Sequence, residues 1–241
     1  MLRPRLSVFE FTLPTIEQAI ASNDGLIAIG GELSVPQLVA AYQRGVFPWF
    51  SEGEPICWWA LSPRTVLLPP KLHVGRSLQK TLRNTAYKVT VNHAFEQVMR
   101  HCADVVRPEQ GGTWINPQML KAYAALHQAG HAHSFEYWCQ DADGAWQLLG
   151  GLYGVQMGRV FFGESMFALA PNASKIAFVH AVRHLHACGV GLIDCQMDTP
   201  HLARFGSELW PFLPFYQHLQ TECAQPLASP LVPADLVISQ P

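Results

Sequence analysis

The stretch 132–166, AHSFEYWCQDADGAWQLLGGLYGVQMGRVFFGESM, contains three segments that we predict to be successive β-strands. Residues 132–139, 146–155 and 159–166 are rich in aromatic and branched apolar side chains, and a turn at Gly158 separates the last two. Strands that follow one another through short turns pair as an antiparallel meander. We therefore place a meander at the centre of the fold.

Helices and single strands are predicted on both sides of this meander. They are helices at 76–83, 93–103, 117–127 and from Asn172 or Ser174 to about 188, and strands at 87–91 and 192–196. Helices that surround a meander, without a regular strand–helix alternation, are typical of the α+β class. The predicted fold class is α+β.

The first 63 residues are predicted to form a small N-terminal α/β domain. A short apolar strand at 25–31 precedes a helix that begins after Ser34 and ends near Arg44, and a further strand is expected at 56–59. Prolines at 63, 69 and 70 interrupt any regular element there. We predict a second, larger domain at 64–241, with an extended or frayed tail from about 221 because that segment is rich in Pro, Ala and Ser.

Composition favours a folded, reduced protein outside the membrane. Of 241 residues, 49% are hydrophobic and 14% are charged, so a sizeable core can form. No stretch approaches the roughly 20 apolar residues of a membrane span, and Glu10 and Pro14 interrupt any signal-peptide core. The six cysteines contain no CxxC pair, which indicates free thiols. We expect a cytoplasmic protein that forms no membrane contact.

The distribution of charge suggests a phosphate-binding surface. The formal net charge is −2, yet no acidic residue lies between Glu54 and Glu96. Six basic residues fall in that interval, at 64, 71, 76, 80, 83 and 88. A segment of one sign on a nearly neutral protein is what local phosphate binding requires, although an ordinary solvated face would have the same composition.

Three polar residues stand out in apolar strands. Asp194 and Gln196 are two apart in LIDCQ, so both side chains are predicted on one face, with Cys195 on the other. Glu164 lies in FFGESMF, where Gly163 allows close approach of a ligand. A buried carboxylate needs partners or a function. The structural alternatives are a turn cap for Asp194 and an ion pair for Glu164.

Other motifs carry weaker arguments. His180, His184 and His186 lack the Glu of an HExxH zinc motif, and the histidines at 127, 131 and 133 have no supporting ligand, so no metal is expected. Cys195 could act as a nucleophile but is better explained by packing. The glycines at 150, 151, 154 and 158 are followed by no GK[ST], so they indicate hairpin and bulge positions.

Several segments in order resemble the leucyl/phenylalanyl-tRNA–protein transferase family across roughly 24–206. The matching pieces are GLIAIGG (25–31), AYQRGVFPWF (41–50), WW (58–59), SPR (62–64), RSL (76–78), TWI (113–115), GHAHSFE (130–136), GGLYGV (150–155), FGESMF (162–167), NASK (172–175) and LIDCQ (192–196). The resemblance implies that the larger domain has a GNAT-like acyltransferase fold. The matching loop Ala168–Asn172 lacks the glycine pair of a pyrophosphate turn, so no coenzyme A or other cofactor is expected.

The resemblance also implies a function. The enzyme would move Leu or Phe, with Met as a further candidate, from aminoacyl-tRNA to an N-terminal Arg or Lys of an acceptor protein, marking it for degradation. We expect it to act as a monomer. The family's catalytic positions correspond to Asp194, Gln196 and Glu164. Pocket residues would be Trp49, Trp114, Phe161, Met166 and Ile193, with Tyr42 and Tyr123 seating the tRNA 3′ end and Arg76, Lys80 and Arg83 holding the acceptor stem.

Some positions depart from the family pattern. Ala168 replaces a frequent Ser after ESMF, and Ala60-Leu61 replace the usual residues before SPR. Phe178 and Ala181 stand where relatives often carry Leu and Phe, so the preference between Leu and Phe is left open.

For the reaction we expect Asp194 to orient and deprotonate the attacking amine and Gln196 to polarise the carbonyl. Proton transfer through the ribose hydroxyl, with Asp194 only positioning, fits the sequence equally. Two other functions remain open, a coenzyme A-dependent N-acyltransferase and a non-catalytic RNA-binding module that stacks bases on Trp and Tyr.

Overall fold

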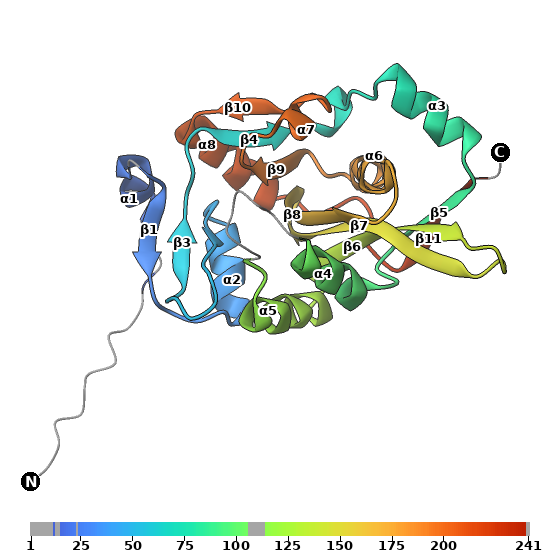
Figure 1. The fold of residues 1–241 in the computed structure, drawn as a ribbon. Coiled ribbons are helices and arrows are strands. Elements are labelled where there is room, and N and C mark those ends of the chain that lie inside the picture. The colour runs from blue at the N-terminus through green and yellow to red at the C-terminus, as the bar shows by residue number, and fades with distance from the viewer. Residues whose placement is uncertain (1–11, 13–14, 23, 106–113, 240–241) are drawn as a thin grey trace, which may run out of the picture.

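The computed structural model describes residue 12 and residues 15–22, 24–105 and 114–239 (Figure 1). Within these ranges the strands form two sheets. A three-stranded sheet has the order β1-β3-β2, and an eight-stranded sheet has the order β10-β4-β9-β8-β7-β6-β5-β11. Helices pack on both, so the predicted α+β class is confirmed.

The smaller sheet belongs to the N-terminal part of the chain. Its elements are α1 (Ile16–Ala21), β1 (Leu26–Ile29), α2 (Val35–Tyr42), β2 (Phe47–Pro48) and β3 (Cys57–Trp59). Two indole side chains form hydrogen bonds that join segments of this N-terminal part. The Trp58 indole N–H donates to the Gly30 carbonyl at 2.8 Å, and the Trp59 indole N–H donates to the Trp49 carbonyl at 2.7 Å. The aromatic residues of this region therefore stabilise the sheet itself.

The larger sheet contains the predicted meander. Its strands are β4 (Arg64–Leu67), β5 (Tyr87–Val91), β6 (Ala132–Gln140), β7 (Trp146–Met157), β8 (Val160–Ala168), β9 (Leu192–Gln196), β10 (Glu208–Trp210) and β11 (Ala234–Ser239). Strands β6, β7 and β8 pair antiparallel in sequence order, which confirms the meander. Strand β9 then pairs parallel to β8 after the α6 crossover.

Helices cover both faces of this sheet. They are η1 (Pro69–Lys71), α3 (Arg76–Asn84), α4 (Phe95–Asp104), α5 (Pro117–Gln128), α6 (Ala173–Ala187), α7 (Pro200–Ala203) and α8 (Phe212–Cys223). Helix α6 packs with one set of buried residues, and α4, α5 and α8 pack with a second set on the opposite face (Figure 1). Gly150 permits the close approach of α6, because a Cβ there would lie 2.6 Å from the Cβ of Ala173.

Of the two forms predicted for the tail from about 221, the frayed one is wrong for the described residues, because part of the tail is an extended strand. Helix α8 continues to Cys223, and β11 pairs antiparallel with β5 along Ala234–Ser239. Leu231 is buried, and its carbonyl accepts a hydrogen bond of 2.8 Å from the Asn92 side chain. The segment is ordered because β5 would otherwise leave a row of backbone groups unpaired at the sheet edge. None of the helices that the structure describes is long and apolar enough to cross a membrane.

Candidate active site

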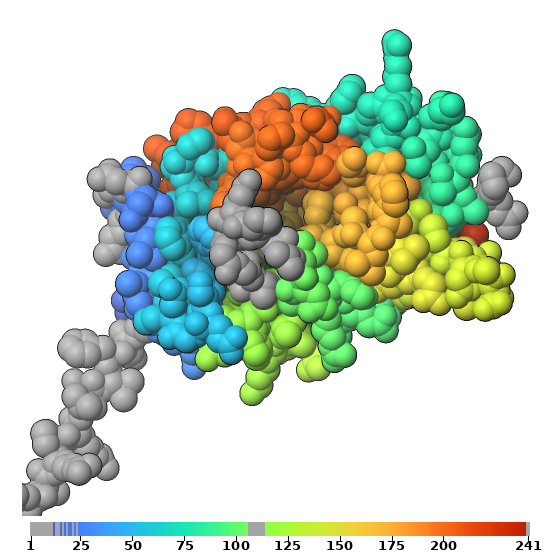
Figure 2. Space-filling model, in the orientation of Figure 1, coloured from blue at the N-terminus to red at the C-terminus, as the bar shows by residue number. Residues whose placement is uncertain are grey.

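A mainly apolar cavity of about 380 Å³ lies between α6, β8, β9 and the segment that leads into α7. Figure 2 shows the surface hollowed between the orange segment that contains α7 and the amber α6. Apolar side chains in its wall include Phe161, Met166, Phe178, Ala181 and Ile193. Trp114 also lines it, together with the polar residues Glu164 and Gln196. An apolar cavity with a few polar groups is the usual form of a small-ligand site.

A β-bulge places Glu164 in this wall. In the β7–β8 ladder, Tyr153 lies opposite Ser165 and Gly154 lies opposite Gly163, so Glu164 is the extra residue of β8. A bulge residue leaves the alternation of the strand and can redirect its side chain. Gly154 makes this possible, since a Cβ there would lie 2.2 Å from the Phe162 carbonyl oxygen. The two strands thus approach each other where the carboxylate leaves the ladder.

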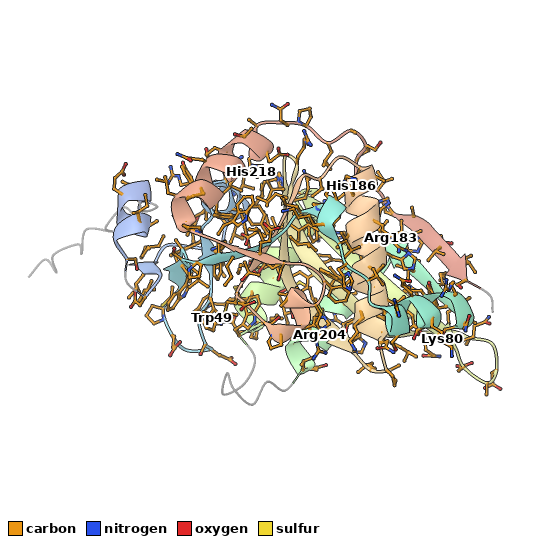
Figure 3. The ribbon with its side chains drawn as sticks, turned by 90° about the horizontal axis from the view of Figure 1, so that it is seen from above. Trp49, Lys80, Arg183, His186, Arg204 and His218 are labelled. Atoms are coloured by element: carbon orange, nitrogen blue, oxygen red, sulfur yellow. The ribbon has the colours of Figure 1, made fainter. Side chains whose placement is uncertain are left out.

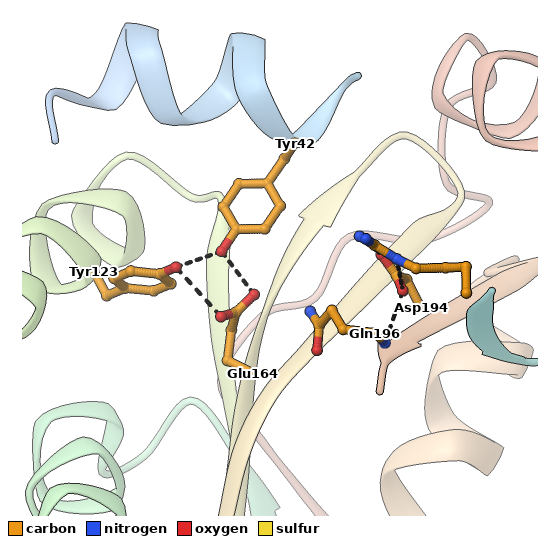
Figure 4. A network of polar contacts seen from close by, with 6 residues as sticks. Tyr42, Tyr123, Glu164, Asp194 and Gln196 are labelled. Atoms are coloured by element: carbon orange, nitrogen blue, oxygen red, sulfur yellow. Dashed lines mark hydrogen bonds and ion pairs between the residues drawn. The ribbon is translucent and has the colours of Figure 1, made fainter. Parts of the chain in front are cut away.

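Two buried tyrosines hold the Glu164 carboxylate (Figure 4). The Tyr42 hydroxyl of α2 donates to Oε1 at 2.7 Å, and the Tyr123 hydroxyl of α5 lies 3.3 Å from Oε2. The two hydroxyls also hydrogen-bond to each other. Both phenol pKa values are raised well above the usual value, first by burial and then by the charge of Glu164. Both tyrosines are therefore protonated donors.

The pKa of Glu164 is raised to about 7. Burial is the largest cause, the Tyr42 hydrogen bond opposes it, and the negative charge of Asp194 adds to it. A carboxyl group with a pKa near neutrality can release and accept a proton under cellular conditions. Glu164 can therefore exchange a proton near neutral pH.

Asp194 and Arg64 form a fully buried ion pair beside the cavity. Arg64 Nε lies 2.8 Å from Oδ1 and Nη2 lies 2.7 Å from Oδ2, and both side chains are 0% exposed. The Arg64 guanidinium also lies 4.9 Å from the ring centroids of Phe47 and Phe215. The Asp194 carboxylate has no exposed surface in this structure, so the part of Asp194 in the reaction stays a prediction.

Gln196, in contrast, reaches the cavity. Its backbone N–H donates to Asp194 Oδ1 at 2.9 Å, and its φ of 55° lies in the left-handed region. Figure 4 shows its side chain between Glu164 and Asp194. Its Nε2 atom is buried, and no described residue accepts a hydrogen bond from it. A buried donor of this kind is available to a ligand.

A second bulge explains why Asp194 and Gln196 do not share a face as predicted. Thr65 of β4 lies opposite Gln196 and Val66 lies opposite Asp194, so Cys195 is the extra residue of β9. Cys195 consequently lines the cavity. Burial raises the pKa of its thiol, which keeps the thiol protonated at neutral pH. This environment supports packing rather than nucleophilic attack.

The other residues predicted from the sequence fall into three places. Trp114, Phe161, Met166 and Ile193 line the cavity, whereas Trp49 does not. The Trp49 ring packs against Trp59 at 5.4 Å between centroids, so the N-terminal sheet holds it. The predicted tRNA-binding residues Arg76, Lys80 and Arg83 are exposed along α3, outside this cavity.

The histidine clusters have structural partners. The Tyr87 hydroxyl lies 3.0 Å from His180 Nε2, and burial lowers the pKa of His180 to about 4. His127 bonds the Ala132 carbonyl at 2.7 Å and stacks on the Phe95 ring. Within the described ranges, no group of three or more His, Cys, Asp or Glu residues is placed to hold a metal ion.

Sequence reasoning missed two parts of the site. In the sequence, Arg64 belongs to the basic segment and to the SPR motif, and neither identified it as the cationic partner that a carboxylate in the apolar strand 192–196 requires. Thr199, His201 and Leu202 form the wall that leads into α7. The helix-capping signal Thr199-Pro200 could have located this turn, since the Thr199 hydroxyl accepts from the Leu202 N–H at 3.2 Å.

An apolar cavity with a titratable carboxyl group and an unpaired amide in its wall is typical of an enzyme that binds a small apolar group. Two family models match the chain. The model for leucyl/phenylalanyl-tRNA protein transferase matches residues 66–220, and the model for the N-terminal domain of that transferase matches residues 31–62. The chain belongs to the leucyl/phenylalanyl-tRNA–protein transferase family, as the sequence predicted.

Curated relatives agree over most of their length. A leucyl/phenylalanyl-tRNA–protein transferase of Neisseria meningitidis serogroup C is 53% identical over 224 residues, which cover 93% of each chain. The same-named protein of Magnetococcus marinus is 53% identical over 88% of this chain and 89% of its own. That of Chromobacterium violaceum is 55% identical over 83% of each chain.

Proposed function

We propose that the chain transfers Leu or Phe, with Met as a further candidate, from aminoacyl-tRNA to the N-terminus of an acceptor protein. The observation that carries this proposal is the apolar cavity of about 380 Å³ with Glu164 and Gln196 in its wall. Its size lies at the lower end of the range of about 300–1,000 Å³ for small-molecule sites. An apolar side chain can fill it while the ester faces the two polar groups. The names of the relatives support the same donor and acceptor classes.

The reaction needs few groups. The neutral α-amine nitrogen of the acceptor attacks the ester carbonyl carbon, a C–N bond forms and the C–O bond to the ribose breaks. The amine gives up one proton and the ribose oxygen takes up one. Because an α-amine has a pKa of about 8, the enzyme mainly has to position it, accept its proton and stabilise the oxyanion.

Glu164 and Gln196 are proposed to serve these steps. Glu164, with its pKa of about 7, accepts the proton of the amine and passes a proton to the leaving ribose oxygen. The unpaired Nε2 of Gln196 donates to the carbonyl oxygen as negative charge develops on it. Asp194 is a positioning residue, because it acts through the Gln196 backbone N–H.

The tRNA body is proposed to bind along α3. Arg76, Lys80 and Arg83 are exposed on this helix, and Lys80 is labelled in Figure 3. Helix α3 contains no acidic residue. Cations on one helix can follow a phosphate backbone. Tyr42 and Tyr123 contribute indirectly, since both are buried against Glu164.

We further propose that the larger domain is GNAT-like and that a division at 63/64 separates it from the N-terminal domain. The antiparallel β6–β8 meander followed by a parallel β8–β9 pair supports the first point. The ranges 31–62 and 66–220 support the second. Coenzyme A is not proposed, because the loop before α6 has no glycine pair.

The acceptor is proposed to expose an N-terminal Arg or Lys, and the product to be marked for degradation by a monomeric, cytoplasmic enzyme. The deciding experiment mixes the purified protein with radiolabelled Phe-tRNA and two peptides that differ only in an N-terminal Arg or Ala. We expect label on the Arg peptide alone. Label on neither peptide, with tRNA still bound, would instead favour a non-catalytic RNA-binding module.

A further inference from the structure

A second cavity lies next to the first and has a different chemical character. Its volume is about 580 Å³, and it lies between α3, the N-terminal end of α6 and the α7 segment. Arg76, Lys175 and Arg204 line it, and none of its lining residues is acidic. No carboxylate within the described ranges pairs with any of these three cations. Figure 3 shows Arg204 near one end of α6, opposite to the end that His186 marks.

The positive charges act on the cavity interior. Burial lowers the pKa of His201, and the charges of Lys175 and Arg204 lower it further. His201 Nε2 is buried, and no described residue hydrogen-bonds to it. A cavity lined by several cations without counter-charges attracts an anion from solution.

Two helix N-termini add partial positive charge there. Helix α3 begins after Gly75 and α6 begins after Asn172, and both flanking residues line the cavity. Gly75 has no side chain to cap α3, and the Asn172 side chain does not cap α6. Instead, the Lys175 ammonium donates to the Asn172 side chain at 3.2 Å. The first backbone N–H groups of a helix favour an anionic ligand, so they reinforce the three cations.

The two cavities share one wall. His201 lines both, and its neighbour Leu202 lines the first while Ala203 and Arg204 line the second. A single ligand could therefore place an apolar group in the first cavity and an anionic group in the second. The alternative is a free anion that binds in the second cavity alone. An aminoacyl-tRNA carries both features, since its phosphodiester groups lie a few bonds from the aminoacyl ester.

We infer that the cavity of Arg76, Lys175 and Arg204 binds the phosphodiester groups at the 3′ end of the RNA donor. This inference rests on the proposed function and adds a site to it. Lys175 and Arg204 are new assignments, and they lie far from the basic helix α3 (Arg76–Asn84) in sequence. The site orients the donor, so that the aminoacyl ester enters the neighbouring cavity in a single position and orientation.

The test compares three donors that carry the same Phe ester. The first is intact Phe-tRNA, the second is the trinucleotide Phe-CCA with its phosphodiesters, and the third is Phe-adenosine, which has none. The variants are Lys175→Met and Arg204→Met, with Lys121→Met on α5 as the matched control. Arg204 is exposed, so its replacement removes no core packing even if Lys175→Met lowers stability.

Each variant is expected to lower kcat/KM about tenfold more for Phe-tRNA and Phe-CCA than for Phe-adenosine. This ratio corresponds to the loss of one charge-assisted hydrogen bond. The salt dependence of tRNA binding should also become shallower by about 0.7–1 per removed cation. Equal losses for all three donors would overturn the inference, and so would the absence of any loss.

Two further experiments distinguish this inference from a free-anion site and from a failure of the proposed function. In the first, inorganic phosphate is added to the wild type, and its inhibition of transfer is measured with Phe-CCA and with Phe-adenosine as donor. Equally strong inhibition of both donors would mean that the cavity is a free-anion site and would overturn the inference. Binding of uncharged tRNA is followed by fluorescence anisotropy. If the wild type transfers no Phe at all, the proposed function fails, yet a weaker, less salt-dependent binding by both variants would still support the phosphodiester site. Unchanged binding would contradict it.

Discussion

Arg64 and Asp194 face each other across β4 and β9 as a bidentate pair, with distances of 2.8 and 2.7 Å and no exposure of either side chain. The pair lies beside the apolar cavity, and one oxygen of Asp194 also accepts a hydrogen bond from the Gln196 backbone N–H. The ion pair therefore joins β4 to β9 and also fixes the backbone of Gln196, whose side-chain amide faces the cavity.

Loss of one partner of this pair should be strongly destabilising. Arg64→Met leaves the Asp194 carboxylate buried without a cation, which costs about 3–5 kcal/mol in comparable buried pairs. The free energy of unfolding from urea denaturation measures this cost. The control is Lys71→Met, because the Lys71–Glu208 pair is exposed and such pairs contribute about 0–1 kcal/mol. Similar losses for both variants would contradict a special role of the buried pair.

The activity should follow the ionisation of Glu164. With a pKa of about 7, Glu164 is a proton acceptor above that pH and a neutral acid below it. We expect kcat/KM to rise as the pH increases through about 7, over and above the ionisation of the α-amine. Glu164→Gln should lower kcat by about 10²–10⁴-fold and remove the rise of kcat/KM around pH 7. A pH–rate profile with an acceptor peptide tests this, and an unchanged rise in the variant would exclude Glu164 as the base.

The raised pKa of Glu164 also predicts that the stability of the folded chain falls as the pH rises, whereas the activity increases. The pKa of Glu164 is higher in the folded chain, about 7, than its ordinary value of 4.5. Between these values the folded chain binds more protons than the unfolded chain, so this group's contribution to stability falls as the pH rises from about 4.5 through about 7. Glu164→Gln cannot ionise, so the variant should gain melting temperature relative to the wild type between pH 5 and pH 8. A constant difference would show that the carboxyl group is not perturbed by folding.

The sequence predicted the strands of the meander because their apolar residues and turns are local signals. Strands β6, β7 and β8 were expected at 132–139, 146–155 and 159–166, and each is observed within two residues of those bounds. The site depends on features that are not local. The bulges at Glu164 and Cys195 depend on how β8 pairs with β7 and how β9 pairs with β4. A strand considered alone predicts strict alternation, which placed Asp194 and Gln196 on one face and Cys195 on the other.

The partner of Asp194 illustrates the same difficulty. Arg64 lies 130 residues away in sequence, and nothing near either residue indicates the contact. The C-terminal strand is a second case. Its composition favours a loose tail, and it is ordered because β5 offers it a row of backbone partners. Tertiary pairing outweighs local propensity at both places.

The size of the residue at 181 should affect the choice of donor. Ala181 of α6 lines the cavity, so Ala181→Leu fills part of the space that a Phe side chain would occupy. We expect kcat/KM for Phe-tRNA to fall at least about 10- to 200-fold relative to Leu-tRNA, the range for a single methylene group in an apolar pocket. Both donors are measured on one enzyme preparation, so a general loss of folding cancels in the ratio. An unchanged ratio would place the aminoacyl side chain elsewhere.

Tyr42 should tune the proton affinity of Glu164. The hydrogen bond from its hydroxyl to Oε1, at 2.7 Å, stabilises the ionised carboxylate and lowers its pKa against the effect of burial. Tyr42→Phe keeps the ring, which packs against Phe162 at 5.0 Å, and removes only the donor. The midpoint of the pH–rate profile should therefore move to higher pH, with kcat recovering in alkaline buffer. Tyr216→Phe on α8 is the control, since Tyr216 does not contact Glu164 in the described hydrogen bonds. A loss of kcat in Tyr42→Phe that is equal at every pH would instead indicate that the hydroxyl acts on the substrate and not through the carboxylate.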